Sequence, residues 1–313
     1  MRNARLLSWP VIIASSAFAS DKSDAALAFL EPLRGESGSL EAVLRRPGAT
    51  LLPDKPPPGA SILFEADGQE VRAPVDPLVD AGVYTIKVEI GDATHKAEHL
   101  RLIRLVPLSR KLEGRIGRYE MGSWPYEGEK PPRTGAYAVP EGFVEVTRDN
   151  RSTRVSKHFK LEQFLTKGQE DIWPKYLVLD ERLLDKLELI IQELKAADLD
   201  VKHVHIMSGF RTPTYNESGG DPRGRGSLSR HVYGDAADIW VDDDGDGRMD
   251  DLNGDRRIDL ADAEVITAAA ERVEARHRSL IGGIAPYPAC CDHGPFAHID
   301  ARGKLARWRG PHQ

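Results

Sequence analysis

The chain has 313 residues, of which 40% are hydrophobic and 29% charged, and its formal net charge is −6. This length is enough for one large domain or two ordinary ones. The mild acidic balance, without a basic stripe interleaved with aromatic residues, gives no reason to expect a nucleic-acid partner.

The first residues have the pattern of an export signal. Arg2 and Arg5 supply a positive start, residues 6–14 a short apolar run, and Ala17 and Ala19 fit the small-x-small cleavage rule. That run is too short to span a bilayer as a resident helix, and no later run reaches the required length. We therefore predict a signal peptide over residues 1–19 and a secreted or periplasmic mature protein without an integral membrane span.

Residues 24–108 carry short runs of alternating apolar residues, over 60–65, 83–90 and 99–106, separated by turn residues. This pattern predicts a small all-β sandwich that is reminiscent of Ig-like domains. From residue 109 to 140 the composition shifts to Gly, Pro, Arg and Lys. This segment is predicted to be an extended linker or a strap, and its aromatic residues favour a strap laid across the next domain.

The remainder, residues 141–313, mixes predicted strands and helices and is therefore expected to be an α+β domain. The clearest helix runs from 180 to 196, because leucine and isoleucine recur there at steps of three and four, and Asp180 can cap its start. Strands are predicted at 143–147, 201–207 and 239–241, and a second helix at 263–277.

Two histidines and an aspartate in this part could converge on one metal ion. They stand in Ser229-Arg-His231-Val-Tyr-Gly-Asp-Ala-Ala-Asp238, which follows Ser208-Gly-Phe-Arg211-Thr, and in Phe296-Ala-His298-Ile-Asp300. Three protein ligands and an open position are typical of a catalytic zinc, whereas a structural zinc has four closed ligands. Asp238 begins an apolar run, and a buried carboxylate is costly unless a cation accompanies it.

These motifs in this order, with a Gly-Gly-Ile…Tyr-Pro segment before the last histidine, resemble the M15 peptidases, which are zinc D,D- and L,D-peptidases acting on peptidoglycan stem peptides. The resemblance covers about residues 143–308. It implies a catalytic domain with a small antiparallel sheet and helices, preceded here by the β domain, and zinc (Zn2+) on His231, Asp238 and His298. It also implies that Arg211 and Ser229 lie near the substrate, although an internal salt bridge is the alternative for Arg211.

The general base is less well defined. A zinc peptidase needs a group that takes a proton from the attacking water and returns it to the leaving amine. M15 relatives usually place a Glu or His a few residues before the last ligand, but Phe296 occupies the position two before His298. Asp292 and His293 are the nearest titratable candidates, and we prefer Asp292. Asp300 is a candidate for orienting His298, although residues two apart on a strand are expected to share a face without touching.

The adjacent Cys290 and Cys291 allow three interpretations: a vicinal disulfide, two free thiols, or metal ligands.

An acidic insertion, residues 242–262, holds nine aspartates in 21 residues. Its spacing resembles paired EF-hand or dockerin-like calcium loops, which place oxygen ligands at loop positions 1, 3, 5, 9 and 12. The first register has Gly247 at position 6, and the second has Arg256 there. We predict calcium (Ca2+) in at least one loop, and a solvated acidic loop is the alternative. The predicted ligands are Asp242, Asp244, Asp246, Asp250 and Asn253 in the first register, and Asp251, Asn253, Asp255, Asp259 and Asp262 in the second.

The sequence as a whole predicts a secreted zinc metallopeptidase that hydrolyses peptidoglycan stem-peptide or cross-link bonds, as a carboxypeptidase or an endopeptidase. One alternative is a non-catalytic cell-wall or peptide-binding module that keeps the metal for recognition. Another is a calcium-dependent structural or adhesion protein.

Overall fold

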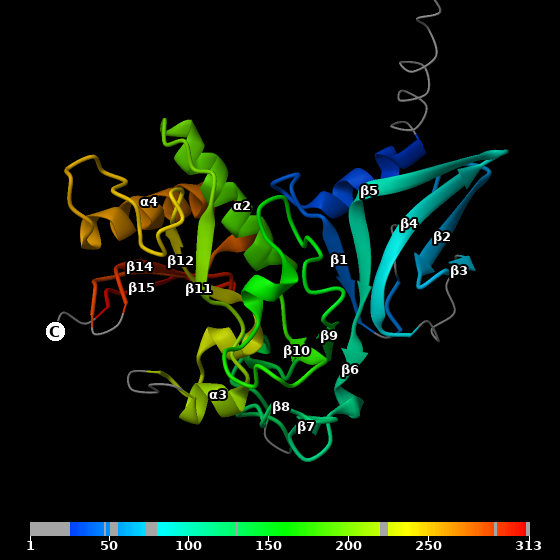
Figure 1. The fold of residues 1–313 in the computed structure, drawn as a ribbon, viewed down its shortest axis with the longest axis horizontal. Coiled ribbons are helices and arrows are strands. Elements are labelled where there is room, and N and C mark those ends of the chain that lie inside the picture. Colours follow the sequence, from blue (N-terminus) through cyan, green and yellow to red (C-terminus); the bar gives the residue numbers. More distant parts are fainter. Residues whose placement is uncertain are drawn as a thin grey trace, which may run out of the picture.

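The computed structural model describes residues 26–46, 48–50, 56–72, 80–128, 131–219, 225–290 and 293–310. The predicted signal peptide, residues 1–19, lies outside these ranges. None of the helices within them is both long enough and apolar enough to cross a bilayer. The fold is mixed α+β, as predicted: an N-terminal β-sheet is followed by a part with small sheets and two long helices (Figure 1).

The N-terminal part is built from strands, in agreement with its alternating sequence. The strands form one five-stranded sheet in the order β1-β5-β4-β2-β3, in which the β1–β5 pair is parallel and the other pairs are antiparallel. The 3-10 helix η1 (Ala28–Arg34) packs on this sheet through Leu30, against Phe64 and Ile86. The strands are β1 Ala42–Arg45, β2 Ala60–Ala66, β3 Gln69–Arg72, β4 Gly82–Ile90 and β5 Ala93–Arg104.

Small pieces of sheet connect this part to the rest of the chain. Strands β6 (Val106–Pro107), β9 (Gly142–Val146) and β10 (Lys175–Leu177) form a three-stranded sheet, and β7 (Arg115–Ile116) pairs with β8 (Tyr119–Glu120). The short 3-10 helices are η2 Leu108–Arg110, η3 Gly135–Tyr137 and η4 Leu161–Phe164. Tyr119, Met121 and Trp124 are buried in the main apolar core, so this connecting segment packs closely on the part that follows.

Helix α2 (Glu181–Ala196) is the helix predicted from the apolar spacing, and the Asp180 carboxylate caps it by accepting from the Arg182 N–H. Its leucines and isoleucines face the main core. Three charged residues in its middle, Asp185, Lys186 and Glu188, are buried as well, and each has a hydrogen-bonding partner. For example, Lys186 donates to Glu274 Oε1 at 2.5 Å and to the Asp300 carbonyl at 2.7 Å.

The sheet that carries the candidate site has the order β11-β12-β14-β13-β15, and only its β13–β15 pair is parallel. Helix α4 packs against β13 and β14, and α2 packs against α4. Because strand side chains alternate, Ala297 and Ile299 join the core on the helical face, whereas His298 and Asp300 face the opposite side. The elements are β11 Val204–Ser208, α3 Pro213–Ser218, η5 Arg230–Tyr233, β12 Ala236–Val241, α4 Leu260–Arg276, η6 Arg278–Leu280, β13 Gly283–Tyr287, β14 Phe296–Asp300 and β15 Ala306–Arg307.

The main apolar core crosses the predicted domain boundary. Leu40, Ala42 and Ile103 of the N-terminal part belong to the same core as the leucines of α2. A hydrogen bond from the Leu44 N–H to Glu181 Oε1, 2.5 Å long, adds a polar contact at this junction. Because this core is shared, the predicted domain boundaries at residues 108 and 140 stay predictions.

Candidate metal centre

The register of two central strands sets Asp238 opposite His298. Strands β12 and β14 are antiparallel, and these two residues are direct partners. Side chains of such partners leave the same face of the sheet with their Cβ atoms about 4.5–5.5 Å apart. The carboxylate and the imidazole, 60 residues apart in the sequence, are thereby brought into contact.

His231 comes from the short helix η5, whose end is a tight turn. The turn is made at Gly234, with φ of 71°, where a Cβ would lie 2.3 Å from the Val178 carbonyl oxygen, so only glycine fits without strain. A buried ion pair spans the same turn: Arg230 Nε donates to Asp235 Oδ1 at 3.0 Å and its Nη2 to Oδ2 at 2.5 Å. Turn and ion pair together fix the direction of the His231 side chain.

The connecting segment over residues 109–140 also holds η5. The Trp124 indole N–H donates to the Val232 carbonyl at 2.7 Å, and Trp124 is only 2% exposed. Arg230 donates to the carbonyl of Ala136, and its guanidinium lies 5.2 Å from the centre of the Tyr137 ring. These contacts make the segment part of the framework of the site.

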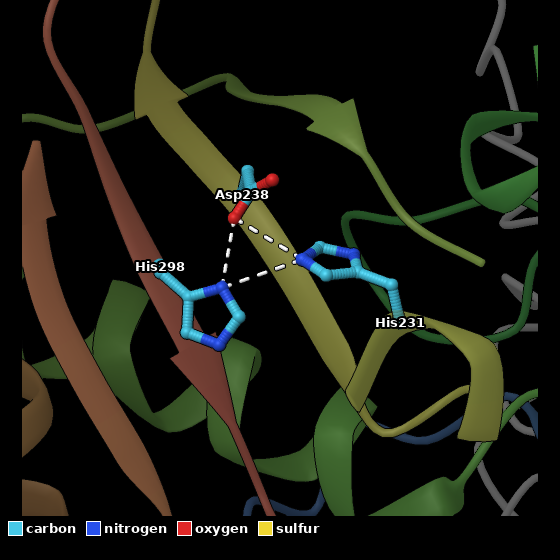
Figure 2. A group of neighbouring side chains, drawn as sticks. All are labelled: His231, Asp238 and His298. Carbon is cyan, nitrogen blue, oxygen red and sulfur yellow. Dashed lines mark hydrogen bonds and ion pairs between the residues drawn. The ribbon is translucent and has the colours of Figure 1, made fainter. Parts of the chain in front are cut away.

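The side chains of His231, Asp238 and His298 point toward one another from η5, β12 and β14 (Figure 2). Asp238 Oδ1 lies 2.9 Å from His298 Nδ1 and 3.3 Å from His231 Nε2, and these two nitrogens are 3.3 Å apart. All three residues are buried. Ligand atoms around a tetrahedral zinc with bonds of about 2.0–2.1 Å are about 3.3 Å apart, so this donor set fits a zinc ion.

Both histidines have their other ring nitrogen in use. His231 Nδ1 donates to the Gly209 carbonyl at 2.7 Å, and His298 Nε2 donates to Asp300 Oδ2 at 3.2 Å. Because a carbonyl and a carboxylate only accept, these nitrogens carry protons. In the neutral rings, the form that binds a metal, the lone pairs of the other two nitrogens would therefore face each other. The arrangement is the one that ligating histidines have, in which a partner fixes the tautomer.

The charges around Asp238 favour a cation in the cluster. Burial by itself would raise the Asp238 pKa, but both imidazoles and the Arg211 guanidinium hold it well below its usual value. Burial opposes protonation of His298, yet hydrogen bonds to Asp238 and Asp300 raise its pKa to about 8. Burial and the charge of Arg211 lower the pKa of His231. An ionised, buried carboxylate thus draws positive charge to its neighbours, and a metal ion would supply the same charge.

Arg211 lies beside the cluster and forms hydrogen bonds to other side chains of the protein. Its Nη2 donates to Asp238 Oδ2 at 2.7 Å and its Nε to Ser208 Oγ at 2.8 Å. The salt bridge considered as the alternative to substrate contact is therefore present, while Nη1 takes no part in these two bonds. Ser229 is half-buried directly before η5, and its side chain makes no capping hydrogen bond there.

The described part of the structure does not place a candidate for the general base in the cluster. Asp292 and Cys291 lie outside the described residues. His293 is half-buried, with its Nδ1 2.8 Å from the Gly294 carbonyl and its ring 5.1 Å from that of Phe296. It is not one of the three residues whose donor atoms gather within 4.8 Å. The backbones of Cys290 and His293 bond to each other in a tight turn.

Two further features complete the site. Asp300 contacts His298, which corrects the expectation that the two side chains share a face without touching, because the long imidazole reaches across the spacing. Tyr287 and Trp308 also border the centre: the indole N–H donates to the phenol oxygen at 2.8 Å, and the His298 and Trp308 rings are 5.1 Å apart. Burial, and then the negative charge of Asp238, raise the Tyr287 pKa. Tyr287 and Trp308 together form a wall beside the centre. The signals for it in the sequence were Tyr287, in the Tyr-Pro pair, and Trp308.

The acidic insertion forms the loop between β12 and α4. Among the described residues Asp242, Asp244 and Asp250 bring carboxylate oxygens within 4.8 Å of one another. Asp246, Asp251 and Asp255 instead accept hydrogen bonds from nearby backbone N–H groups, as does Asn253. Asp259 and Asp262 cap the start of α4.

The comparison with protein families connects the site to a known group of enzymes. No curated protein and no solved structure matches the chain. Residues 157–254 match the family model described as Peptidase M15. The matched part contains His231 and Asp238 and ends before His298, so the third member of the cluster rests on the geometry. The match supports an M15-family peptidase, and a peptidase implies a peptide substrate.

Proposed function

We propose that the chain is an exported zinc peptidase that hydrolyses stem-peptide or cross-link bonds of peptidoglycan. The observation that carries this proposal is the buried group of His231, Asp238 and His298, with donor atoms 2.9–3.3 Å apart. Support for a peptidase comes from the family match, and support for export comes from the sequence of residues 1–19.

The three residues would hold the zinc ion, which when bound supplies a Lewis acid and an acidified water. The rest of the site orients this set. Asp300 fixes the ring of His298, the Gly209 carbonyl fixes that of His231, and Arg211 holds the second oxygen of Asp238. Asp238 thus presents one oxygen to the ion while its other oxygen is already bonded.

The substrate would lie over the polar face of the sheet, between Arg211 and the wall of Tyr287 and Trp308. Peptidoglycan stem peptides end in a carboxylate, and a guanidinium N–H donates a strong, charge-assisted hydrogen bond to such a group. The Nη1 group of Arg211 is the part of that side chain left for such a contact. Asp292, or else His293, would take the proton of the attacking water.

A digest of purified muropeptides tests the function. The zinc-loaded protein is expected to release D-alanine or to cleave cross-links, and mass spectrometry of the products identifies the bond. His231→Ala is expected to abolish cleavage while circular dichroism stays unchanged, and His95→Ala, on the N-terminal sheet, is the control that keeps it. Intact muropeptides after incubation with folded, zinc-loaded wild-type protein would contradict the proposal.

A further inference from the structure

We propose that the loop over residues 242–250 is a second metal site, which binds one calcium ion through the carboxylates of Asp242, Asp244 and Asp250. The loop leaves the end of β12 and leads toward α4 (Figure 1). The site is separate from the His231–Asp238–His298 centre and does not depend on its activity.

The three carboxylates converge although each bears a negative charge. Within the described ranges, one oxygen from each of Asp242, Asp244 and Asp250 lies within 4.8 Å of the others. Such a gathering is unfavourable without a counter-charge.

Asp242 supplies a separate observation that points to a ligand. The residue is 4% exposed, and its Oδ1 is buried without a hydrogen-bond partner. Leaving a buried polar oxygen unpaired costs about 1–3 kcal/mol, and more for a charged group. An acceptor of this kind, on a carboxylate that belongs to the group, is satisfied by a cation.

Backbone N–H groups of the loop hold each of the three carboxylates in place. Asp242 Oδ2 accepts from the Gly247 N–H at 3.2 Å, and Asp250 Oδ2 accepts from the Asp243 N–H at 2.8 Å. Asp244 Oδ1 accepts from the Asp246 N–H at 3.1 Å. The carboxylates are therefore oriented before an ion arrives.

The ends of the loop are fixed to the core. The Asp242 N–H donates to the His203 carbonyl at 3.1 Å, and the Asp250 N–H donates to the Val241 carbonyl at 3.0 Å. Met249, beside Asp250, is 2% exposed and belongs to the main apolar core. An ion in the loop would therefore stabilise the end of β12, the strand that carries Asp238.

The chemistry of the ligands favours calcium over zinc or magnesium. All three donors are carboxylate oxygens, which suit hard cations rather than zinc. Calcium accepts six to eight oxygens in flexible geometry, whereas magnesium demands a near-ideal octahedron. Asp242, Asp244 and Asp250 occupy positions 1, 3 and 9 of the spacing found in EF-hand loops, and Asp246 occupies position 5.

The following acidic register is left out of the proposal, because two of its carboxylates, those of Asp251 and Asp262, already accept hydrogen bonds through both oxygens. Asp262 Oδ1 accepts from the Leu252 N–H at 2.8 Å, and its Oδ2 accepts from the Asp259 N–H at 2.8 Å. Both oxygens of Asp251 also accept from backbone N–H groups. Calcium at this second loop stays a prediction from the sequence.

Titration of the full-length mature protein with calcium chloride, followed by calorimetry and by the unfolding temperature, tests the site. The wild type is expected to bind calcium at least tenfold more tightly than magnesium and to unfold at a higher temperature when calcium is present. Asp244→Asn, at an exposed position, is expected to weaken one binding event at least tenfold, as is Asp242→Asn. Asp200→Asn removes an exposed carboxylate elsewhere and is expected to bind as the wild type does.

Three results would overturn the proposal: no calcium binding by the folded wild type, unchanged calcium affinity in folded Asp244→Asn, or equal affinity for magnesium. Zinc content is measured in every sample, so that loss of the first metal is not mistaken for loss of the second. Asp244→Asn keeps the test decisive should Asp242→Asn fail to fold, because Asp244 is exposed and Asp242 is buried.

Discussion

The imidazole of His298 is held from both sides, by Asp238 at Nδ1 and by Asp300 at Nε2. Its Nε2 donates to Asp300, which is fully buried and also accepts from the Gly283 N–H at 2.7 Å. Arg302 forms an ion pair with the same carboxylate. Asp300 is thus a positioning residue that keeps the Nδ1 lone pair of His298 directed at the metal centre.

Replacing Asp300 with asparagine tests this role. Asp300→Asn keeps the size of the side chain but removes its charge, so we expect zinc affinity to fall about 10–100-fold. Competition with a chelating indicator measures the affinity. Asp185→Asn is the control, since Asp185 is equally buried but accepts from the Glu36 N–H, on another part of the fold. If both variants bind zinc as the wild type does, Asp300 has no such role.

For single residues, the sequence predicted which side chains meet at the metal centre better than it predicted their hydrogen-bonding partners. His231, Asp238 and His298 were singled out because their order and residue types match a zinc set, and they do meet. The partner of Arg211 could not be read from the sequence, since it depends on how the loop after β11 folds beside β12. The contact between Asp300 and His298 was considered there, but the two side chains were expected not to touch. The general base stays a prediction, because Asp292 lies outside the described residues.

Among the elements, η5 is the one that is least able to hold its own shape. It is a single short turn, and its geometry depends on Gly234, on the Arg230–Asp235 pair and on Trp124. The strands β12 and β14, by contrast, are fixed along their length by ladder hydrogen bonds. The position of His231 is therefore more sensitive to distant changes than those of Asp238 and His298.

A pair of tryptophan substitutions measures the contribution of the connecting segment. Trp124→Phe leaves the Val232 carbonyl without its donor, so we expect the free energy of unfolding to fall by about 1–3 kcal/mol. Trp240→Phe is the matched control, because the Trp240 indole N–H has no hydrogen-bond partner. Chemical denaturation compares the two. Equal losses would show that the bond to Val232 contributes nothing of its own.

The two long helices show how much of a helix the apolar periodicity of the sequence can predict. Helix α2 matches the predicted range almost to the residue, because its apolar spacing and its Asp180 cap agree. Helix α4 begins at Leu260 rather than at 263, because the Asp259 carboxylate accepts from the Ala261 N–H and caps an earlier start. The prediction had treated those aspartates as calcium ligands and so placed the helix after them.

For the molecule as a whole, the sequence predicted an N-terminal β domain and a separate α+β domain. In the structure the two parts share one apolar core. The N-terminal sheet has a small core of its own around Phe64, yet Leu40, Ala42 and Ile103 belong to the main core. Apolar alternation reveals which residues are buried but not against which neighbour. The shared core is for that reason the part of the fold that the sequence could not show.

A shortened chain tests whether this shared core matters. A chain that begins at residue 109 lacks those side chains, and we expect its unfolding temperature to fall by about 5 °C or more, since a loss of about 2 kcal/mol shifts a domain of this size by about 4–8 °C. A chain that begins at residue 26 keeps the sheet and serves as the control. Scanning calorimetry would contradict this view if both chains unfolded at the same temperature.

The zinc content of the purified protein, determined by mass spectrometry, tests the central claim most directly. The wild type and His205→Ala are expected to hold one zinc ion per chain in the His231–Asp238–His298 centre, because His205 stacks on Trp240 outside that group. His231→Ala is expected to hold almost none. A folded wild type without zinc, or a His231→Ala variant that keeps its full zinc content, would contradict the assignment.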